Sequence, residues 1–294
     1  MRIDRIETLI LKVPTGDKSF YSSQARFPER NSLLVKITTD DGIVGWGEGG
    51  QYGPPEPVAS AVVDVLALRL LGEAADQPVR IWEDNYAFSR DFGQKGTYLE
   101  AMSAIDIALW DIWGKSLGRP ARHLLGGSFR DAALAYGTGC YYPDNFCDTP
   151  AMMKALAEEV TGYAAAGVTA IKIKIGLLSV EQDRERIELI RDTVGPDVKL
   201  MADANHAYNT APAIRIGRVM EKHDFLWFEE PVPPEDRDGY RRLRASLDVP
   251  IAGGECEFSR YGFRDLIGGG CVDIVQPDLC CSGGLSEWVK IAAT

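Results

Sequence analysis

The segment from Ala170 to Ala204 reads AIKIKIGLLSVEQDRERIELIRDTVGPDVKLMADA. It opens on an apolar run centred near Ile173 and closes on a second apolar run centred near Leu200. Residues 180–194, between the two runs, have the length and the pattern of a helix. Two short apolar strands joined by a helix indicate a parallel pair with a right-handed crossover.

The same alternation of strand and helix continues on both sides of this segment. Six such units without a dinucleotide-binding fingerprint favour a (β/α) barrel over a doubly wound sheet. A complete barrel has eight strands in about 250 residues, so residues 131–294 predict an α/β fold with an incomplete TIM-type barrel of about six strands. The sequence ends at Thr294 within the expected sixth helix, and we expect about two further strand–helix units to be missing from it. The other expected strands are centred near Ala135, Phe228, Ile251 and Ile274, and the other expected helices cover residues 151–166, 211–222, 240–246 and 260–267.

Residues 1–130 have a different pattern and predict an N-terminal α+β capping domain, followed by the barrel domain over residues 131–294. Residues 3–13 are β-rich, and two further β-rich runs flank Asp40-Asp41-Gly42. An Asp-Gly turn between such runs predicts a hairpin. We also expect a long loop over residues 16–30 and helices over residues 58–71 and 98–117.

Charge and cysteine content limit the possible partners. The formal net charge is −11, which disfavours nucleic acid and anionic membrane surfaces as partners. The six cysteines form no Cys-x-x-Cys pair, as is typical of reduced thiols in a cytoplasmic protein. The N-terminus lacks the apolar region of a signal peptide, and no apolar run approaches the length of a membrane span.

Polar residues follow the expected strands at their carboxyl ends, where barrels of this type carry their active sites. Lys172 and Lys174 alternate on one face of a strand, and Asp203, Glu229 and Glu255 end the next three strands. Three converging carboxylates supply the oxygen ligands that suit Mg²⁺. The sequence therefore predicts a magnesium site beside a pair of lysines.

This combination predicts one kind of chemistry. Like charge and burial both lower the pKa of an ammonium group, so we expect one of the two lysines to supply a neutral amine base. A proton α to a carboxylate is very weakly acidic because its removal gives a dianionic enediolate, and a metal ion neutralises that charge as it develops. A lysine base combined with Mg²⁺ is an established arrangement for forming and stabilising such an enediolate.

Several short strings occur in a characteristic order along the whole chain. They are Gly45-Trp46-Gly47-Glu48, Ala104 to Asp111, Leu124-Leu125-Gly126-Gly127, Lys172-Ile173-Lys174-Ile175-Gly176, Asp203-Ala204-Asn205-His206, Trp227-Phe228-Glu229-Glu230-Pro231, Pro250 to Glu255 and Gln276-Pro277-Asp278-Leu279-Cys280. In the order and spacing of these strings the chain resembles the mandelate racemase and muconate lactonizing branch of the enolase superfamily, and within it the galactarolactone cycloisomerase group and the sugar-acid dehydratases.

The resemblance implies roles for individual residues. Asp203, Glu229 and Glu255 match the metal ligands, Lys174 matches the base on one face of the substrate, and Lys172 matches its partner. Asp278 matches the carboxylate that orients a histidine on the opposite face; strand seven, which should carry that histidine, is expected to end roughly 25 to 30 residues further on, beyond Thr294. The loops over residues 16–30 and 49–53 match the capping loops that shape specificity, and they contain the expected substrate contacts Tyr21 and Tyr52. Asn205 and His206, which follow Asp203, are the other expected substrate contacts.

The resemblance implies Mg²⁺-dependent removal of a proton α to the carboxylate of a sugar acid or its lactone, followed by β-elimination. The enzyme would be a cycloisomerase or a dehydratase, with a small molecule as its partner and a homo-oligomer as its usual state. Two alternatives stay open. One is a racemase or epimerase, which needs bases on both faces, and the other is a truncated, non-catalytic relative that binds only the metal or the sugar acid.

Overall fold

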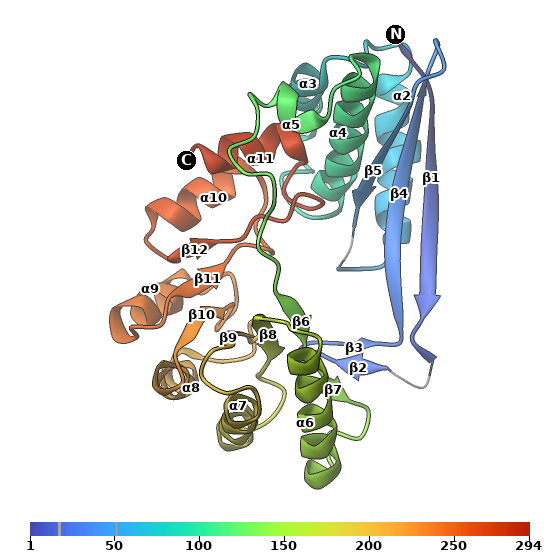
Figure 1. Ribbon diagram of the computed structural model, residues 1–294. Helices are drawn as coiled ribbons and strands as arrows, with labels where there is room; N and C mark the ends of the chain where they lie inside the picture. The colour runs from blue at the N-terminus through green and yellow to red at the C-terminus, as the bar shows by residue number, and fades with distance from the viewer. Residues whose placement is uncertain (17–18, 51) are drawn as a thin grey trace.

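Three antiparallel strands form a long sheet in the first part of the chain (Figure 1). The computed structural model describes residues 1–16, 19–50 and 52–294. The strands β1 (Ile3–Pro14), β4 (Glu29–Thr39) and β5 (Val44–Gly49) lie in the order β1-β4-β5. The β4–β5 hairpin closes as the Asp-Gly turn predicts, since Gly42 has a φ of 85° and its N–H donates to the carbonyl of Thr39.

The helix α4 (Thr97–Ser116) packs directly on β5, confirming the predicted helix over residues 98–117. The contact depends on small residues, because every second residue of β5 is a glycine. A Cβ atom added to Gly47 would collide with the carbonyl oxygen of Ala104 on α4. The close approach of helix and sheet therefore requires glycine at this position.

Other helices of the first part were predicted less well. The expected helix over residues 58–71 is present but is divided into α1 (Pro55–Ser60), the π-helix η2 (Ala61–Leu66) and α2 (Ala67–Leu70). The helices α3 (Pro78–Ser89) and the short α5 (Ala121–Leu124) were not predicted from the sequence.

The expectation of a plain loop over residues 16–30 is wrong for the residues that the structure describes. The strands β2 (Phe20–Tyr21) and β3 (Arg26–Phe27) pair with each other, and β2 also pairs with β7 (Tyr142–Pro143). Residues 17–18 of that expected loop lie outside the described residues. In Figure 1, this small sheet lies at the lower end of β1 and β4, next to the second part of the chain.

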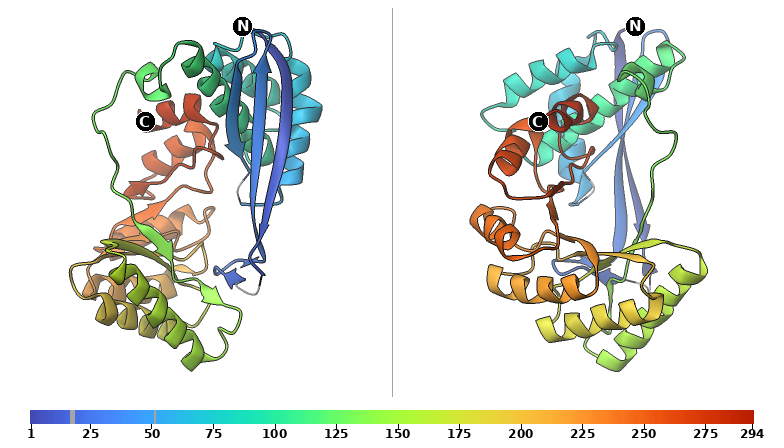
Figure 2. Two further views of the ribbon diagram at one scale, coloured as in Figure 1. Left: turned by 45° about the vertical axis from the view of Figure 1, so that its right-hand side comes forward. Right: turned by 60° about the vertical axis from the view of Figure 1, so that its left-hand side comes forward.

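The second part is a sheet of six parallel strands, as predicted. The strands lie in the order β12-β11-β10-β9-β8-β6, and every neighbouring pair is parallel. Figures 1 and 2 show the strands in an open arc with the helices along its outer side. The strands are β6 (Gly137–Gly139), β8 (Ala170–Lys174), β9 (Lys199–Asp203), β10 (Phe225–Glu229), β11 (Ile251–Gly253) and β12 (Ile274–Val275), and the helices are α6 (Thr149–Ala165), α7 (Val180–Val194), α8 (Thr210–Lys222), α9 (Arg237–Ser246), α10 (Ser259–Gly268) and α11 (Leu285–Ala292).

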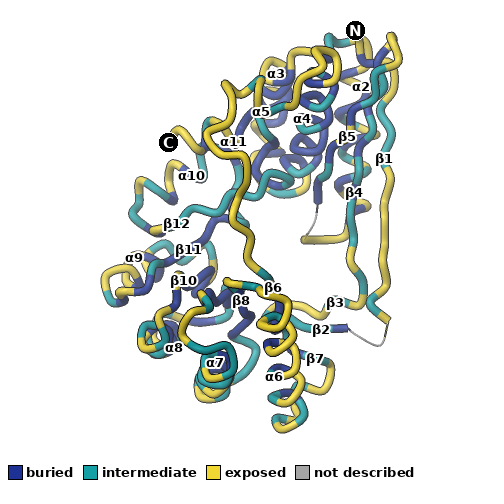
Figure 3. The backbone as a smooth tube through the Cα atoms, in the orientation of Figure 1, coloured by how far each residue is buried: buried dark blue, intermediate teal, exposed yellow. Residues whose placement is uncertain are grey.

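The buried apolar residues of the described part of the chain form two hydrophobic clusters. One joins the long sheet to α4 and its neighbouring helices, and the other lies between the parallel strands and their outer helices. Figure 3 shows the buried residues concentrated on these elements. The first strand of the parallel sheet begins two residues after its expected centre at Ala135, which is exposed. Of the helices in the described part of the chain, none is both long and apolar enough to cross a membrane.

Candidate active site

The register of the parallel strands aligns the predicted residues at one edge of the sheet. Lys174 of β8 is level with Asp203 of β9, and Asp203 is level with Glu229 of β10. Glu255 comes two residues after the end of β11. The structure therefore brings these side chains together at the carboxyl ends of their strands, as the sequence predicts.

Both lysines reach across the sheet to carboxylates on neighbouring strands. Lys172 Nζ lies 2.7 and 2.9 Å from the two carboxylate oxygens of Glu229 and 3.8 Å from Asp203 Oδ2. Lys174 Nζ contacts Asp203 Oδ2 and lies 3.0 Å from the side-chain oxygen of Asn205. All four charged side chains are buried. The alternation along β8 thus points both amines into the same cluster.

The expected low pKa of the lysines is wrong for this arrangement. Burial lowers the pKa of Lys172, but the negative charges of Glu229 and Asp203 outweigh burial, and the pKa is raised. Burial likewise lowers the pKa of Lys174, and the charge of Asp203 again raises it above its usual value. Repulsion between the two ammonium groups is the smaller effect, because each has a carboxylate as its nearest charged neighbour.

The three predicted ligands Asp203, Glu229 and Glu255 meet at one point. One carboxylate oxygen from each lies within 4.8 Å of the other two. Burial, followed by the charges of neighbouring carboxylates, raises the pKa of Glu255 to about 8. Burial and the charge of Asp203 also raise the pKa of Glu229. Converging carboxylate oxygens that repel one another suit a hard divalent cation, so these residues fit Mg²⁺.

Neighbouring polar side chains fix the orientation of Glu229, although the sequence pattern assigned them no role. Trp227 Nε1 and Gln276 Nε2 both donate to Glu229 Oε2, at 3.1 and 2.9 Å. Trp227 lies two residues before Glu229 on the same strand, so the period of two could have identified it. Gln276 comes from the far strand β12, and only the order of the strands brings it close.

Aromatic rings lie over both lysines and were also missed. The Nζ atom of Lys172 is 5.7 Å from the ring centre of Tyr136, and that of Lys174 is 5.4 Å from the ring centre of Tyr141. Such distances allow cation–π attraction. Both tyrosines lie near β6, the edge strand beside β8.

The predicted substrate contacts fall into different surroundings. Asn205 lies inside the cluster, where its N–H donates to Asp203 Oδ1 at 2.8 Å. His206 Nε2 lies 3.3 Å from Glu230 Oε2. Tyr21 pairs with Tyr142 on β7, and its ring meets Phe146 edge-on.

Tyr52 and Asp278 form a contact between the two parts of the chain. The Tyr52 hydroxyl donates to Asp278 Oδ2 at 2.7 Å, and the N–H of Cys280 donates to Asp278 Oδ1 at 2.7 Å. The three histidines of the sequence are His123, His206 and His223, and none of the hydrogen bonds described for Asp278 goes to one of them. The orienting role that the resemblance implies for Asp278 therefore stays a prediction.

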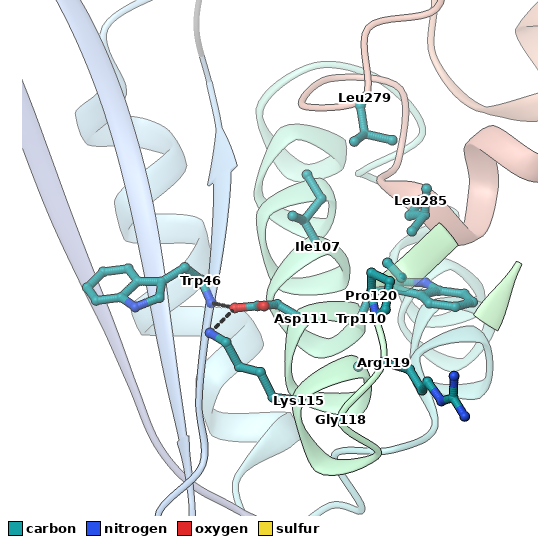
Figure 4. Close-up of a pocket in the computed structure, with 12 residues that line it drawn as sticks. Trp46, Ile107, Trp110, Asp111, Lys115, Gly118, Arg119, Pro120, Leu279 and Leu285 are labelled. Carbon is teal, nitrogen blue, oxygen red and sulfur yellow. Dashed lines mark hydrogen bonds and ion pairs between the residues drawn. The ribbon is translucent and has the colours of Figure 1, made fainter. Parts of the chain in front are cut away.

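A cavity of about 750 Å³ lies between α4 and the segment before α11 (Figure 4). Its walls are mainly apolar and include Trp110, Leu279 and Leu285. At its rim Asp111 accepts a hydrogen bond from the Trp46 N–H at 2.9 Å and pairs with Lys115. Its lining residues all lie outside the group of lysines and carboxylates, so the candidate for acid–base chemistry is the strand-end cluster.

Parallel strands that end in two lysines and three convergent carboxylates define a class of protein: a barrel-type enzyme scaffold with a candidate metal centre. Residues 5–126 match the mandelate racemase / muconate lactonizing enzyme N-terminal domain, and residues 154–294 match the enolase C-terminal domain-like family. The chain belongs to the mandelate racemase/muconate lactonizing enzyme family of the enolase superfamily.

Similar proteins of known name are isomerases and dehydratases. The chain is 44% identical to the D-galactarolactone cycloisomerase of Agrobacterium fabrum, over 99% of this chain and 75% of that protein. It is 39% identical to the arabinonate dehydratase of Saccharolobus solfataricus, over 88% of this chain and 68% of that protein.

Solved structures agree with this assignment. The 3,6-anhydro-D-galactonate cycloisomerase from Zobellia galactanivorans matches with a TM-score of 0.89 and 43% identity, covering 100% of this chain and 76% of that one. A racemase from Streptomyces coelicolor with bound magnesium matches with a TM-score of 0.90 and 29% identity, covering 99% of this chain and 80% of that one.

Proposed function

We propose that this protein removes the proton α to the carboxylate of a sugar acid or its lactone, and that the resulting enediolate undergoes β-elimination. Among the reactions of its relatives we favour cycloisomerisation, in which the lactone ring opens as the C–O bond at the β-carbon breaks. The 44% identity to a galactarolactone cycloisomerase supports this choice. The observation that carries the proposal is the meeting of Asp203, Glu229 and Glu255 beside the amine of Lys174.

Lys174 is the proposed base. In its neutral form the amine takes the α-proton, and the electron pair of the broken C–H bond is delocalised into the carboxylate of the substrate as an enediolate. The pair then forms a carbon–carbon double bond while the β C–O bond breaks and the leaving oxygen takes its electrons. Asn205 supports this role because its side-chain oxygen holds the Lys174 amine at 3.0 Å and so fixes its direction.

We propose Asp203, Glu229 and Glu255 as the ligands of Mg²⁺. Bound there, Mg²⁺ would neutralise the negative charge that develops on the substrate and would compete for the carboxylates that hold the two ammonium groups. Lys172, buried between Glu229 and Asp203, keeps a positive charge next to the reacting carboxylate. Its role is electrostatic, and that of Lys174 is proton transfer.

The N-terminal part of the chain, residues 1–130, is called the capping part below and supplies the first of the proposed specificity contacts. Tyr52 lies at the start of the capping helices and binds Asp278 of the parallel-sheet part. This hydrogen bond supports a position for Tyr52 at the mouth of the site, with Asp278 orienting a group on the face opposite Lys174. We also propose two further substrate contacts: Tyr21, from the loop over residues 16–30 that the resemblance assigns to specificity, and His206, from the loop after β9.

The test is exchange of the substrate α-proton in D₂O, followed by NMR over a set of acid sugars and their lactones, with and without Mg²⁺. We expect Mg²⁺-dependent exchange, its loss in Lys174→Ala, and its retention in Lys199→Ala, which removes an exposed lysine at the opposite end of β9. Exchange that persists in Lys174→Ala or after EDTA treatment would contradict the mechanism. Ring-opened product identifies a cycloisomerase, loss of water identifies a dehydratase, and inversion without elimination identifies a racemase; binding of Mg²⁺ without exchange identifies a non-catalytic relative.

We further propose that the boundary between the capping domain and the barrel domain falls near residue 130, that the protein is cytoplasmic, and that it forms a homo-oligomer. The boundary is supported by the two hydrophobic clusters, which draw their members from opposite sides of that position apart from Phe258 and Tyr261. Light scattering of the purified protein tests the oligomeric state.

A further inference from the structure

A second group of possible metal ligands lies beside the carboxylate cluster. It consists of His206, Glu230 and Cys256, and each comes one to three residues after one of the three carboxylates proposed as Mg²⁺ ligands. The imidazole nitrogen, one carboxylate oxygen and the thiol sulfur all lie within 4.8 Å of one another. We propose that these three residues form a separate site for a borderline-soft divalent cation such as Zn²⁺.

The distances within the group match tetrahedral coordination. With metal bonds of about 2.0 Å to nitrogen and oxygen and about 2.3 Å to sulfur, a tetrahedral ion separates nitrogen from sulfur by roughly 3.5 Å and nitrogen from oxygen by roughly 3.3 Å. Cys256 Sγ lies 3.6 Å from His206 Nε2, and Glu230 Oε2 lies 3.3 Å from the same nitrogen. These two distances need almost no adjustment to hold a zinc ion.

A buried carboxylate oxygen gives further support. Glu230 is only 1% exposed, and its Oε2 atom accepts no hydrogen bond of good geometry among the described residues, although the His206 imidazole lies 3.3 Å away. A buried carboxylate oxygen without a donor is costly unless a cation or another donor satisfies it. This atom is the one directed at His206.

The backbone holds the group in place. The N–H of His206 donates to the carbonyl of Glu230 at 2.7 Å, and the N–H of Glu230 donates to the carbonyl of Ala252 at 3.0 Å. The first bond joins the loop after β9, which carries His206, to the loop after β10, which carries Glu230, and the second joins Glu230 to β11. The geometry therefore depends on the sheet itself and not on mobile side chains alone.

Ligand chemistry separates this site from the carboxylate cluster. A thiolate and an imidazole favour Zn²⁺ or Co²⁺, whereas Asp203, Glu229 and Glu255 offer oxygen only and suit Mg²⁺. As the sulfur–metal bond forms, the Cys256 thiol releases its proton to solvent. A small cavity of about 10 Å³ lies against Glu230 and Cys256.

Titration with Co²⁺ tests the proposal, because a thiolate bound to cobalt gives a charge-transfer absorption in the near ultraviolet and an oxygen-only site does not. We expect this absorption to saturate at one equivalent, to be removed by Zn²⁺ and to survive excess Mg²⁺. It should be lost in Cys256→Ser and kept in the matched control Cys147→Ser, which removes an exposed thiol elsewhere. Absence of the band from the unmodified protein, or its persistence in Cys256→Ser, would overturn the proposal.

Two further variants keep the test independent of folding and of the proposed function. His206→Gln and Glu230→Gln each retain the thiol and should weaken cobalt binding by roughly tenfold or more, since even outer partners of a metal site are worth 10–100-fold. Unchanged cobalt affinity in both would overturn the proposal. Glu255→Gln should stop α-proton exchange yet keep the absorption, so failure of the Mg²⁺ chemistry and failure of the second site give different results.

Discussion

The buried carboxyl group of Asp106 should make the stability of the protein depend on pH. Its side chain is only 2% exposed within α4, and its Oδ2 atom accepts a hydrogen bond from the N–H of Ser286 at 2.8 Å. Ser286 lies in the first turn of α11, so Asp106 joins the capping part to the last helix of the parallel-sheet part. Burial raises the pKa of Asp106 from 3.8 to about 7, against the opposing effect of the Ser286 and Leu285 donors.

The direction of this pH dependence follows from the pKa values of Asp106 in the unfolded and the folded chain. Between about pH 4 and pH 7 the unfolded chain loses the Asp106 proton while the folded chain keeps it. The free energy of unfolding therefore falls as the pH rises through this range, and the fall is complete above about pH 7. A shift of about three pKa units corresponds to roughly 4 kcal/mol, with a steepest slope of about 1.4 kcal/mol per pH unit.

Asp106→Asn should remove this dependence, because the amide has nearly the same shape, retains an oxygen for the Ser286 N–H and cannot ionise. We expect the stability of the variant relative to the unmodified protein to increase between pH 4.5 and pH 8, by up to roughly 4 kcal/mol in urea unfolding. Asp265→Asn is the control: its pKa is lowered by Arg264, so its difference should stay flat over this range. A flat difference for Asp106→Asn, or one of opposite slope, would refute the reasoning.

Three other changes test packing and polar contacts. Gly47→Ala should lower the free energy of unfolding measured in urea by about 1–3 kcal/mol, because the added methyl group would collide with the Ala104 carbonyl. Gly53→Ala is the control and should have little effect, because the space around Gly53 is open. Lys172→Met should cost about 3–5 kcal/mol by leaving Glu229 buried without its partner, and adding Glu229→Gln should recover much of that loss in the same unfolding assay. Tyr52→Phe should lower the free energy of unfolding by about 1 kcal/mol through the lost Asp278 hydrogen bond, measured in the same assay. With Tyr52 at the mouth of the site as proposed, it should also raise KM more than it changes kcat.

Local sequence patterns were sufficient for the parallel sheet and for the position of its polar residues. The strand after Ala170 could be placed because apolar and charged residues alternate in it, and the same alternation directed both lysines to one side. The residues at the ends of β9 and β10 then met because parallel strands share one direction, which the repeated strand–helix order already implied. Periodicity and connection rules therefore predicted both the edge and the residues that occupy it.

Contacts between distant segments could not be predicted in this way. The strands β2 and β7 have two residues each and lie about 120 positions apart in the sequence, so no local pattern predicts their pairing. The raised pKa of Lys174 has the same origin, since the carboxylate of Asp203 arrives from another strand. The missed helix α3 is different, because Pro78 at its first turn and buried residues at Ile81, Trp82 and Asn85 form a local helical signal.

The small sheet of β2, β3 and β7 couples the capping part to the catalytic candidates. Ser23, in the turn between β2 and β3, donates to the carbonyl of Ala204 at 2.6 Å and lies 3.2 Å from that of Asn205. Asn205 in turn holds the amine of Lys174. Because Ser23 binds backbone oxygens, a change in the shape of this turn displaces the loop after β9 whatever side chains that loop carries. Under the proposed function, substitutions in the turn around Ser23 should therefore alter the direction of the Lys174 amine as well as the substrate contacts, so that KM and kcat change together.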